Sequence, residues 1–277
     1  LHPEMLMKRH IDKLVAKLIS EGFDVFDVIR SCTINPALHY GLETGLLKPG
    51  QPADFIIVDD YRSMNIIETW INGKKVFSKK EVHFDYYGAD PVNNFNCSKI
   101  NIRDIRVTAE SDKIRVIQAY DGNLFTKENI ENVKRGSLVE SDNKSDILKI
   151  VVKDRYKDLT PAAGFISGFG LKAGAFASSV AHDSHNIICI GTNDNDIVKA
   201  LNEVIRMKGG LAVANGKNIY SLPLPVAGIM SDQPVDKVAY EYEKLSEIVK
   251  SNGCKMSAPF MTLSFMALLV IPELKLS

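Results

Sequence analysis

A cluster of polar residues enclosed by two apolar runs constrains the fold of this chain more than any other feature. Residues 175–181 are mostly small and apolar, and residues 187–190 read Ile-Ile-Cys-Ile. Apolar runs of this kind, rich in β-branched residues, are typical of buried strands. The polar cluster between them consists of His182, Asp183, Ser184, His185 and Asn186. Because an unpaired buried polar group costs several kcal/mol, these side chains must pair with one another, with water or with a ligand.

The polar cluster allows a catalytic, a binding and a structural interpretation. We treat His182, Asp183 and His185 as candidate catalytic residues, and Ser184 and Asn186 as candidate substrate-binding residues. The His-x-x-His spacing beside an aspartate also suggests a metal site. On a segment that passes from strand to turn, however, positions i and i+3 point to different faces, and no third close ligand is evident. We therefore expect this chain to bind no metal, and the alternative to a functional role is a structural polar network.

Composition argues against several classes of function. The 277 residues include 34 basic and 34 acidic side chains, so the formal net charge is zero and nothing indicates nucleic-acid binding. The four cysteines lie far apart and form no Cys-x-x-Cys pair, which is typical of reduced thiols in the cytoplasm. The longest apolar stretch, residues 260–271, is too short for a membrane span, which needs about 20 residues. We expect a cytoplasmic globular protein with no nucleic-acid or membrane partner.

The first part of the chain is predicted to contain helices followed by a small β block. Apolar residues at helical spacing predict helices over residues 3–20 and 24–32, and then a short helix with Asn35 as its cap and Pro36 in its first turn. A strand is predicted at residues 55–59, followed by a hairpin whose turn is Asn72-Gly73, and a polar linker is predicted at residues 85–98.

The second part is predicted to be a layered mixture of strands and helices. Strands are expected at residues 147–153, 165–169, 175–181 and 187–190, and a second Asn-Gly hairpin at residues 211–222. An amphipathic helix is expected at residues 194–207 with Asp194 as its N-cap. Residues 223–230 are expected to be extended, and a last long helix at residues 234–251 is expected to be capped by Ser231 or Asp232.

Two motifs in the first part resemble the end of the amidohydrolase superfamily. They are Asn-Pro-Ala at residues 35–37 and Pro-Gly-Gln-Pro-Ala-Asp at residues 49–54. In that superfamily the last helices of a metal-dependent (β/α)8 barrel are followed by a β-sandwich built from both ends of the chain. The resemblance implies that residues 1–41 are the end of such a barrel and that residues 42–88 are a portion of the β-sandwich.

Three later stretches resemble the C-terminal domain of the bacterial adenine deaminases. They are residues 168–186, which include Ser-Val-Ala-His-Asp-Ser-His-Asn, residues 222–231, Leu-Pro-Leu-Pro-Val-Ala-Gly-Ile-Met-Ser, and residues 259–265, Pro-Phe-Met-Thr-Leu-Ser-Phe. The resemblance assigns residues 89–277 to that domain. The implied fold class is α+β: the last helices of an incomplete (β/α)8 barrel, part of a β-sandwich, and a mixed α/β C-terminal domain.

The resemblance also implies a reaction, the hydrolysis of adenine to hypoxanthine and ammonia in purine salvage or catabolism. In this family two divalent metal ions, manganese or iron, lower the pKa of a bridging water, and the resulting hydroxide attacks the carbon that carries the amino group. An acidic residue and a histidine move protons to the leaving ammonia. The complete enzyme is expected to be a homo-oligomer. Other amidohydrolases act on other rings, but the stretch at residues 179–186 favours adenine.

The chain departs from the family because the barrel-strand ends that carry the metal ligands are absent. The last ligand, an aspartate, would immediately precede Leu1, so His2 is a further candidate for substrate binding. A (β/α)8 barrel needs all eight strands and cannot close from residues 1–41. We therefore expect a C-terminal fragment of an adenine deaminase that has no deaminase activity alone. The alternative is a non-catalytic cap or oligomerisation module for an amidohydrolase barrel.

Overall fold

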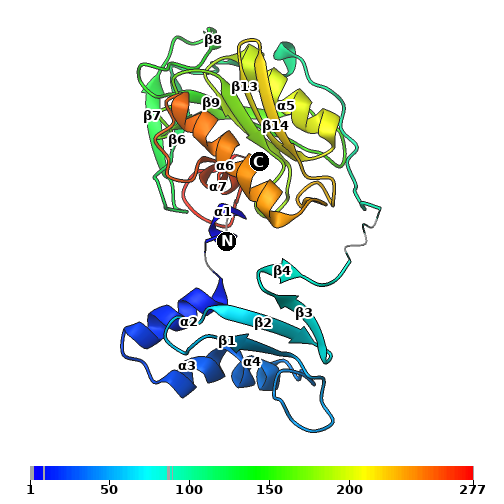
Figure 1. Cartoon of the computed structure of the whole chain (residues 1–277). Helices are drawn as coiled ribbons and strands as arrows, with labels where there is room; N and C mark the ends of the chain where they lie inside the picture. The colour runs from blue at the N-terminus through cyan, green and yellow to red at the C-terminus, as the bar shows by residue number, and fades with distance from the viewer. Residues whose placement is uncertain (1–2, 9, 86–87, 89, 277) are drawn as a thin grey trace. The chain divides into compact units, whose positions relative to one another are not determined.

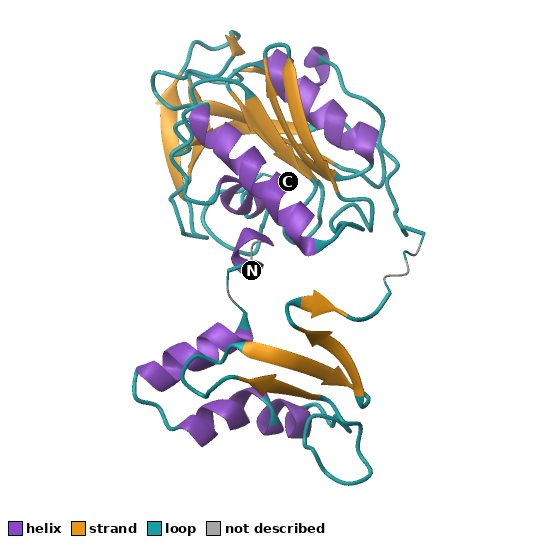
Figure 2. Ribbon diagram, in the orientation of Figure 1, coloured by secondary structure: helices purple, strands orange, loops and turns teal. Residues whose placement is uncertain are grey.

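The computed structural model describes residues 3–8, 10–85, 88 and 90–276, and the chain divides into two compact units (Figures 1 and 2). Unit 1 is Leu1–Ala89 and unit 2 is Asp90–Ser277. Both units contain helices and sheets, so the expected α+β class is confirmed. Within the described ranges, every helix is too short or too polar to traverse a bilayer.

Unit 1 begins with helices α1 (Pro3–Leu6), α2 (Ile11–Ser20), α3 (Val25–Cys32) and α4 (Ile34–His39). The single helix predicted over residues 3–20 is therefore wrong. His10, which precedes α2, has an extended backbone with φ −137° and ψ −155°, and an extended residue cannot continue a helix. Helix α3 is capped by Asp24 as predicted, because its carboxylate accepts hydrogen bonds from the N–H groups of Phe26 and Asp27 at 2.9 and 3.1 Å.

The predicted cap of helix α4 is wrong. The helix starts at Ile34, so Asn35 lies inside its first turn and Thr33 is the flanking residue. Pro36 is tolerated in this turn because the first N–H groups of a helix have no intrahelical partner, and proline lacks that group. Gly41 follows the helix with φ +64°, a left-handed conformation that glycine adopts at no steric cost.

The sheet of unit 1 is antiparallel, with the strand order β1-β2-β3-β4. Its strands are β1 (Phe55–Val58), β2 (Ile66–Ile71), β3 (Lys74–Ser78) and β4 (Glu81–Val82). The predicted hairpin is confirmed. Its turn residues, Asn72 and Gly73, have φ of +50° and +71°, the conformation that suits the twist of a two-residue hairpin.

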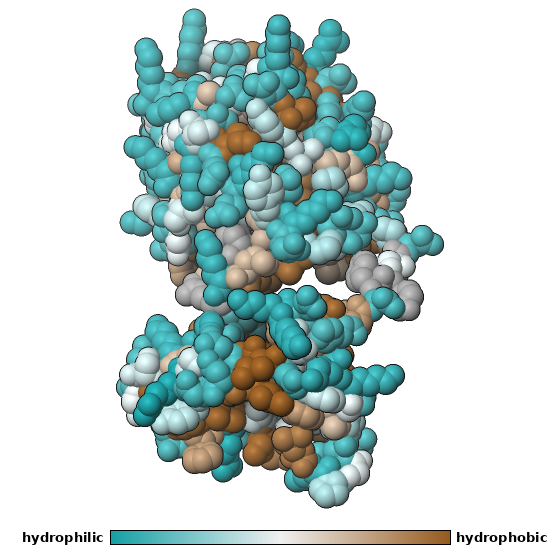
Figure 3. Space-filling model, in the orientation of Figure 1, coloured by the Kyte–Doolittle hydropathy of each residue, from teal (hydrophilic) through white to brown (hydrophobic). Residues whose placement is uncertain are grey.

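Few apolar side chains of unit 1 are buried. Its core cluster has three buried members, Val15, Val28 and Met64. The apolar stripe of α2 is largely open to solvent, with Ile11 50% and Leu14 53% exposed. Figure 3 shows apolar surface of unit 1 as brown areas. Contiguous exposed apolar surface is typical of a face that binds another body.

Unit 2 contains an eight-stranded sheet with the order β14-β13-β11-β12-β9-β10-β6-β7. Neighbouring strands are antiparallel except β10 and β6, which are parallel. The strands are β6 (Lys113–Gln118), β7 (Lys127–Asn132), β9 (Leu148–Lys153), β10 (Ala162–Ser167), β11 (Ala175–Ser178), β12 (Ile187–Gly191), β13 (Gly210–Asn215) and β14 (Asn218–Pro223). Unit 2 also contains a small two-stranded sheet of β5 (Val107–Thr108) and β8 (Leu138–Val139). A 3-10 helix, η1 (Ile102–Ile105), precedes β5.

Helices cover both faces of this sheet (Figure 1). Helix α5 (Asp194–Met207) packs on one face against small side chains of β11 and β13. Helices α6 (Val235–Ser251) and α7 (Pro259–Ser264) pack on the other face against larger side chains such as Phe176 and Leu211. Because successive side chains of a strand point to opposite faces, each central strand contributes to two cores.

The predicted cap of α5 is wrong by one residue. The side chain of Asn193 accepts a hydrogen bond from the N–H of Asp196 at 2.9 Å, so Asn193 is the N-cap. Asp194 is instead the first helical residue. Its carboxylate lies 2.5 Å from the Nζ of Lys149, a fully buried residue of β9, and so pairs with a buried cation.

Three other expectations about unit 2 need correction. Helix α6 starts at Val235 with Pro234 as the flanking residue, not Ser231 or Asp232. The segment predicted to be extended at residues 223–230 contains a turn, closed by the N–H of Met230 donating to Val226 O at 3.0 Å. The strand predicted at residues 175–181 ends at Ser178.

Candidate functional site

The polar cluster lies in an eight-residue loop, residues 179–186, that connects β11 to β12. These two strands are neighbours in the sheet, with Ser178 opposite Ile188. The first loop residue, Ser179, is fully buried, and its hydroxyl donates to Gly228 O at 2.5 Å and accepts from Gly210 N at 2.7 Å. The hydrogen bonds of this hydroxyl are made within the protein, so Ser179 anchors the start of the loop.

His182 lies on an aromatic surface. Its ring stacks on Phe265 with centroids 4.7 Å apart and an interplanar angle of 22°. Its backbone N–H donates to Ser264 O at 2.9 Å, at the end of α7. The ring of His185 lies 5.8 Å from that of His182. The structure therefore brings the two candidate histidines together and packs one of them against the C-terminal segment.

His185 and Asn186 carry polar atoms whose hydrogen bonds are not made within the described part of the chain. Both His185 Nδ1 and Asn186 Oδ1 are buried there without a partner. Burial, His182 and Arg155 lower the pKa of His185, while Asp183 acts in the opposite direction. The environment thus favours the neutral imidazole.

The remaining residues of the cluster face solvent. Asp183 and Ser184 are exposed, and the backbone carbonyl of Ser184 accepts a hydrogen bond from the hydroxyl of Tyr156 at 3.2 Å. His2, the other predicted substrate-binding residue, lies outside the described residues. In the described ranges, no three His, Cys, Asp or Glu side chains converge as metal ligands would.

Sequence reasoning missed Arg155 and Tyr156, which support this loop from the side of β9. Arg155 is only 4% exposed, and its guanidinium donates to Tyr156 Oη at 2.7 Å. The sequence did contain a signal, because these residues come shortly after the apolar run of β9, and a polar residue near the end of a buried strand must find a partner. The partners themselves come from distant parts of the chain.

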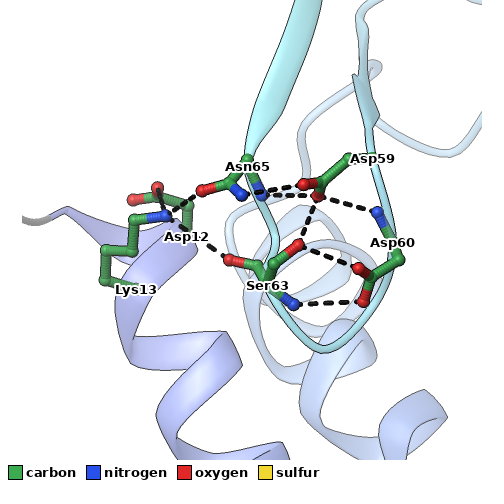
Figure 4. Close-up of polar contacts among 6 residues, drawn as sticks. All are labelled: Asp12, Lys13, Asp59, Asp60, Ser63 and Asn65. Carbon is green, nitrogen blue, oxygen red and sulfur yellow. Dashed lines mark hydrogen bonds and ion pairs between the residues drawn. The ribbon is translucent and has the colours of Figure 1, made fainter.

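A second polar cluster lies in unit 1, where the turn between β1 and β2 meets α2 (Figure 4). Asp59 accepts hydrogen bonds from the Ser63 hydroxyl and from Asn65 Nδ2, the latter at 2.7 Å, and these bonds lower its pKa well below the usual range. Lys13 Nζ of α2 donates to Asn65 Oδ1 at 2.6 Å. Because these groups pair with one another, we interpret the cluster as a device that orders the turn.

The two clusters thus differ in how far their hydrogen bonds are satisfied. The turn at residues 59–65 is internally paired, whereas the loop at residues 179–186 has buried polar atoms without partners among the described residues, and exposed side chains beside them. Each unsatisfied buried group requires an explanation, and a bound ligand or a neighbouring segment is one. The loop at residues 179–186 is therefore the candidate functional site.

Comparison with known proteins identifies relatives of both units. The profile of the Adenine deaminase C-terminal domain matches residues 123–277, and that of the Amidohydrolase family matches residues 3–76. An adenine deaminase of Salinibacter ruber is 46% identical over 280 residues, which cover 100% of this chain and 51% of that protein.

Two further relatives match this chain with similar identity and coverage. An adenine deaminase of Methanosarcina barkeri is 46% identical over 286 residues, covering 99% of this chain and 52% of the relative. An adenine deaminase of Parabacteroides distasonis is 42% identical over 277 residues, covering 100% of this chain and 51% of the relative. This chain spans about half the length of the curated relatives it matches.

Proposed function

Because this chain belongs to the adenine deaminase family, we propose that it forms the C-terminal part of an enzyme that hydrolyses adenine to hypoxanthine and ammonia. The resemblance inferred from three sequence stretches is confirmed, and the match of residues 123–277 to the family's C-terminal domain is the observation that carries the proposal. Adenine is the proposed substrate of the complete enzyme, and purine salvage or catabolism in the cytoplasm is its proposed setting. We also propose a homo-oligomer, which sedimentation of the complete protein tests.

Unit 1 is proposed to contain the last barrel helices, residues 1–41, and a portion of the β-sandwich, residues 42–88, with the C-terminal domain at residues 89–277. The match of residues 3–76 to the amidohydrolases supports this division. So does the open apolar face of α2, because barrel helices bury such a face against their neighbours. On this proposal the remainder of the enzyme covers that face.

The loop at residues 179–186 is proposed to border the substrate site as a lid. Its exposed residues, Asp183 and Ser184, offer a carboxylate and a hydroxyl to the amino group and ring nitrogens of a purine. His182 supplies a flat ring beside them, supported by Phe265. Asn186 and the neutral His185 complete the set as proposed binding and proton-transfer groups. The proposed binding role of His2 stands on the family resemblance alone.

The described residues of this chain do not fit a pair of catalytic metal ions. Metal sites need at least three converging protein ligands, and the loop brings together two imidazole rings with a single exposed carboxylate, Asp183. We propose that the manganese or iron of the complete enzyme is held by residues outside this chain. In that enzyme the metal supplies an activated water. The loop residues bind and orient the ring, exclude solvent water and move protons.

The first test is an assay of the purified 277-residue chain beside the full-length protein, both with manganese or iron supplied. We expect adenine turnover only from the full-length protein. Turnover by the 277-residue chain at a comparable rate would contradict the proposed distribution of metal ligands.

The second test addresses the loop in the full-length protein. We expect His182→Ala and His185→Asn each to lower kcat/KM by roughly 10- to 100-fold, the range in which a positioned proton-transfer group acts. Thermal stability is measured on the same samples. Normal turnover per folded molecule together with lost stability would show that the loop is a structural network.

A second candidate function is a non-catalytic module that packs against an amidohydrolase barrel or mediates oligomerisation. The exposed apolar side chains of unit 1 favour it, because they suit a surface that another body covers. Adding a separately produced barrel portion distinguishes the two: the module interpretation requires tight association while loop substitutions leave turnover unchanged.

A further inference from the structure

Arg155 is a buried cation that forms no ion pair with an acidic residue in the described part of the chain. It lies two residues beyond the end of β9 and is 4% exposed. Its Nε is buried without a hydrogen-bond partner in the same ranges. Burying a guanidinium is costly unless its surroundings compensate, so the residues that do surround it indicate what it does.

Three segments that are distant in sequence meet at this guanidinium. Nη2 donates to the hydroxyl of Tyr156 at 2.7 Å, and that hydroxyl donates in turn to Ser184 O in the candidate loop. Nη1 donates to Ala227 O at 2.8 Å, in the turn at residues 226–230. The ring of Phe95, in the segment that leads into unit 2, lies 5.6 Å from Cζ.

The segment at residues 92–96 is fastened to the same place by its backbone. The N–H of Asn96 donates to the carbonyl of Arg155 at 2.7 Å, and the carbonyl of Val92 accepts from the N–H of Ala227 at 2.7 Å. Arg155 thus contacts this segment with both its backbone and its side chain. A planar guanidinium suits this role because it can donate in two directions and pack against rings with its faces.

A glycine provides the room that the guanidinium occupies. A Cβ atom at Gly228 would lie 2.0 Å from Arg155 Nη1, well inside contact distance, and the φ of this residue is +71°. Gly228 also approaches Gly209 closely, where an added Cβ would lie 2.3 Å from Gly228 Cα. The close fit fixes the position of Arg155 relative to the turn.

We infer that Arg155 is a positioning residue that ties the loop at residues 179–186, through Tyr156, to the segment at residues 92–96. The loop itself has few direct anchors beyond Ser179 and the bonds at its histidine backbones. The hydrogen bond from Tyr156 reaches the exposed part of the loop, at Ser184. The catalytic consequence of this tie rests on the proposed function of the loop.

Tyr156→Phe is the sharpest test, because it removes one hydroxyl and keeps the ring that stacks on Arg155. In the 277-residue chain, we expect amide hydrogen exchange at residues 182–186 to accelerate roughly threefold to tenfold, the effect of losing the hydrogen bond from Tyr156 to Ser184 O. Exchange in β9 and β12 should stay unchanged. The matched control is Tyr240→Phe, on the solvent-exposed side of α6. Unchanged exchange in the loop of the Tyr156→Phe variant would overturn the inference.

Phe95→Leu tests the connection to the other segment. It keeps apolar bulk but removes the ring beside the guanidinium, so we expect faster exchange at residues 92–96 and at residues 182–186 together. A response confined to residues 92–96 would overturn the coupling through Arg155. Arg155→Lys, which keeps the charge but loses the planar fork, should reproduce the loop response.

Kinetics of Tyr156→Phe in the full-length protein separate this inference from the proposed function. With both correct, kcat/KM per folded molecule falls by a similar threefold to tenfold, about the factor expected for the lost hydrogen bond to the loop, while the melting temperature falls because the buried Nη2 of Arg155 also loses its acceptor. Faster loop exchange with unchanged kcat/KM would support the tie and overturn the catalytic role of the loop. Lower kcat/KM with unchanged exchange would overturn the tie and leave the proposed function standing.

Discussion

Unit 1 and unit 2 use apolar residues in opposite ways. In unit 2 the central strands send alternate side chains into two cores, one under α5 and one under α6 and α7. In unit 1 the cluster of buried residues has three members, and the stripe of α2 that resembles a core face is half exposed. Helix α2 of unit 1 and helix α5 of unit 2 are similarly amphipathic, so the difference between them lies in what is present to cover the apolar face.

An amphipathic pattern therefore indicates which face of an element must be covered, but it does not indicate which structure covers that face. Unit 2 contains both layers that its sheet requires, and a unit of this size can bury enough surface to be stable alone. Unit 1 combines a small sheet and short helices, and most of its large apolar side chains remain accessible. Its stability should therefore depend on a covering body, which is the role that we propose for the rest of the enzyme.

Cutting the chain between the units should give the largest effect. We expect residues 90–277 to melt cooperatively, because both faces of the sheet are covered within that unit. Residues 1–89 alone should show no cooperative transition and should associate through their apolar surface. Circular dichroism melts and sedimentation of the two pieces check this, with the 277-residue chain as control. A cooperative melt of residues 1–89 as a monomer would contradict the claim that unit 1 depends on a covering body for its stability.

Truncating one core residue in each unit compares how much free energy of unfolding each core contributes. Phe176 is fully buried and meets Phe260 edge to face at 5.3 Å, so Phe176→Ala should cost unit 2 about 3–5 kcal/mol. Val28→Ala in unit 1 removes two methyl groups from a small cluster and should cost about 1–2 kcal/mol. Urea unfolding of the full-length protein, in which the remainder of the enzyme is proposed to cover unit 1, measures both losses with a probe in each unit. Equal losses would mean that unit 1 has a core of its own.

An ion pair in each unit allows a similar comparison, with smaller expected losses of stability. Lys149 is fully buried beside Asp194, so Asp194→Asn leaves an unpaired buried cation and should cost about 3 kcal/mol, at the low end because Asp194 retains some exposure. The pair of Lys75 and Glu68 in unit 1, 2.6 Å apart, is more exposed, so Glu68→Gln should lower stability much less than Asp194→Asn does. A double variant, Lys149→Met with Asp194→Asn, is the control and should recover much of the loss. No recovery would show that Asp194 acts through something other than Lys149.

Features determined by nearby residues could be predicted from the sequence. The Asn72-Gly73 hairpin, the Asp24 cap and the buried strands β9 and β12 follow from local conformational preference and continuous apolar runs. Strand β7, Lys-Glu-Asn-Ile-Glu-Asn, was missed because all six of its residues are exposed at the sheet edge. An edge strand without a buried face leaves no alternation in the sequence.

The candidate site was only half predictable for a related reason. His182 and His185 stand out because polar residues interrupt two apolar runs. Arg155 does not stand out, because its partners, Phe95 and Ala227, lie about 60 and 70 residues away in sequence and meet only in the folded sheet. The exposure of the apolar face of α2 could not be predicted, because periodicity indicates which side of a helix is apolar and gives no indication of what covers it.

The pH dependence of stability gives the smallest predicted effect and distinguishes the loop of unit 2 from the rest of the chain. Burial, His182 and Arg155 lower the pKa of His185 in the folded protein, with Asp183 opposing them. As the pH falls below about 6.5, the ordinary value for histidine, the unfolded chain takes up a proton that the folded loop resists, so stability decreases.

We therefore expect the melting temperature of unit 2 to fall between pH 7 and pH 5, and His185→Gln to remove part of that fall. The decrease should be smaller than the loss caused by Asp194→Asn, because the imidazole is only partly buried. His39→Gln, on the exposed end of α4, is the control and should leave the profile of unit 2 unchanged. A His185→Gln profile parallel to that of the wild type would mean that the imidazole is as free to take up a proton in the folded loop as in the unfolded chain. The loop would then be as well accommodated as the paired turn at residues 59–65, and the contrast between the two polar clusters would fail.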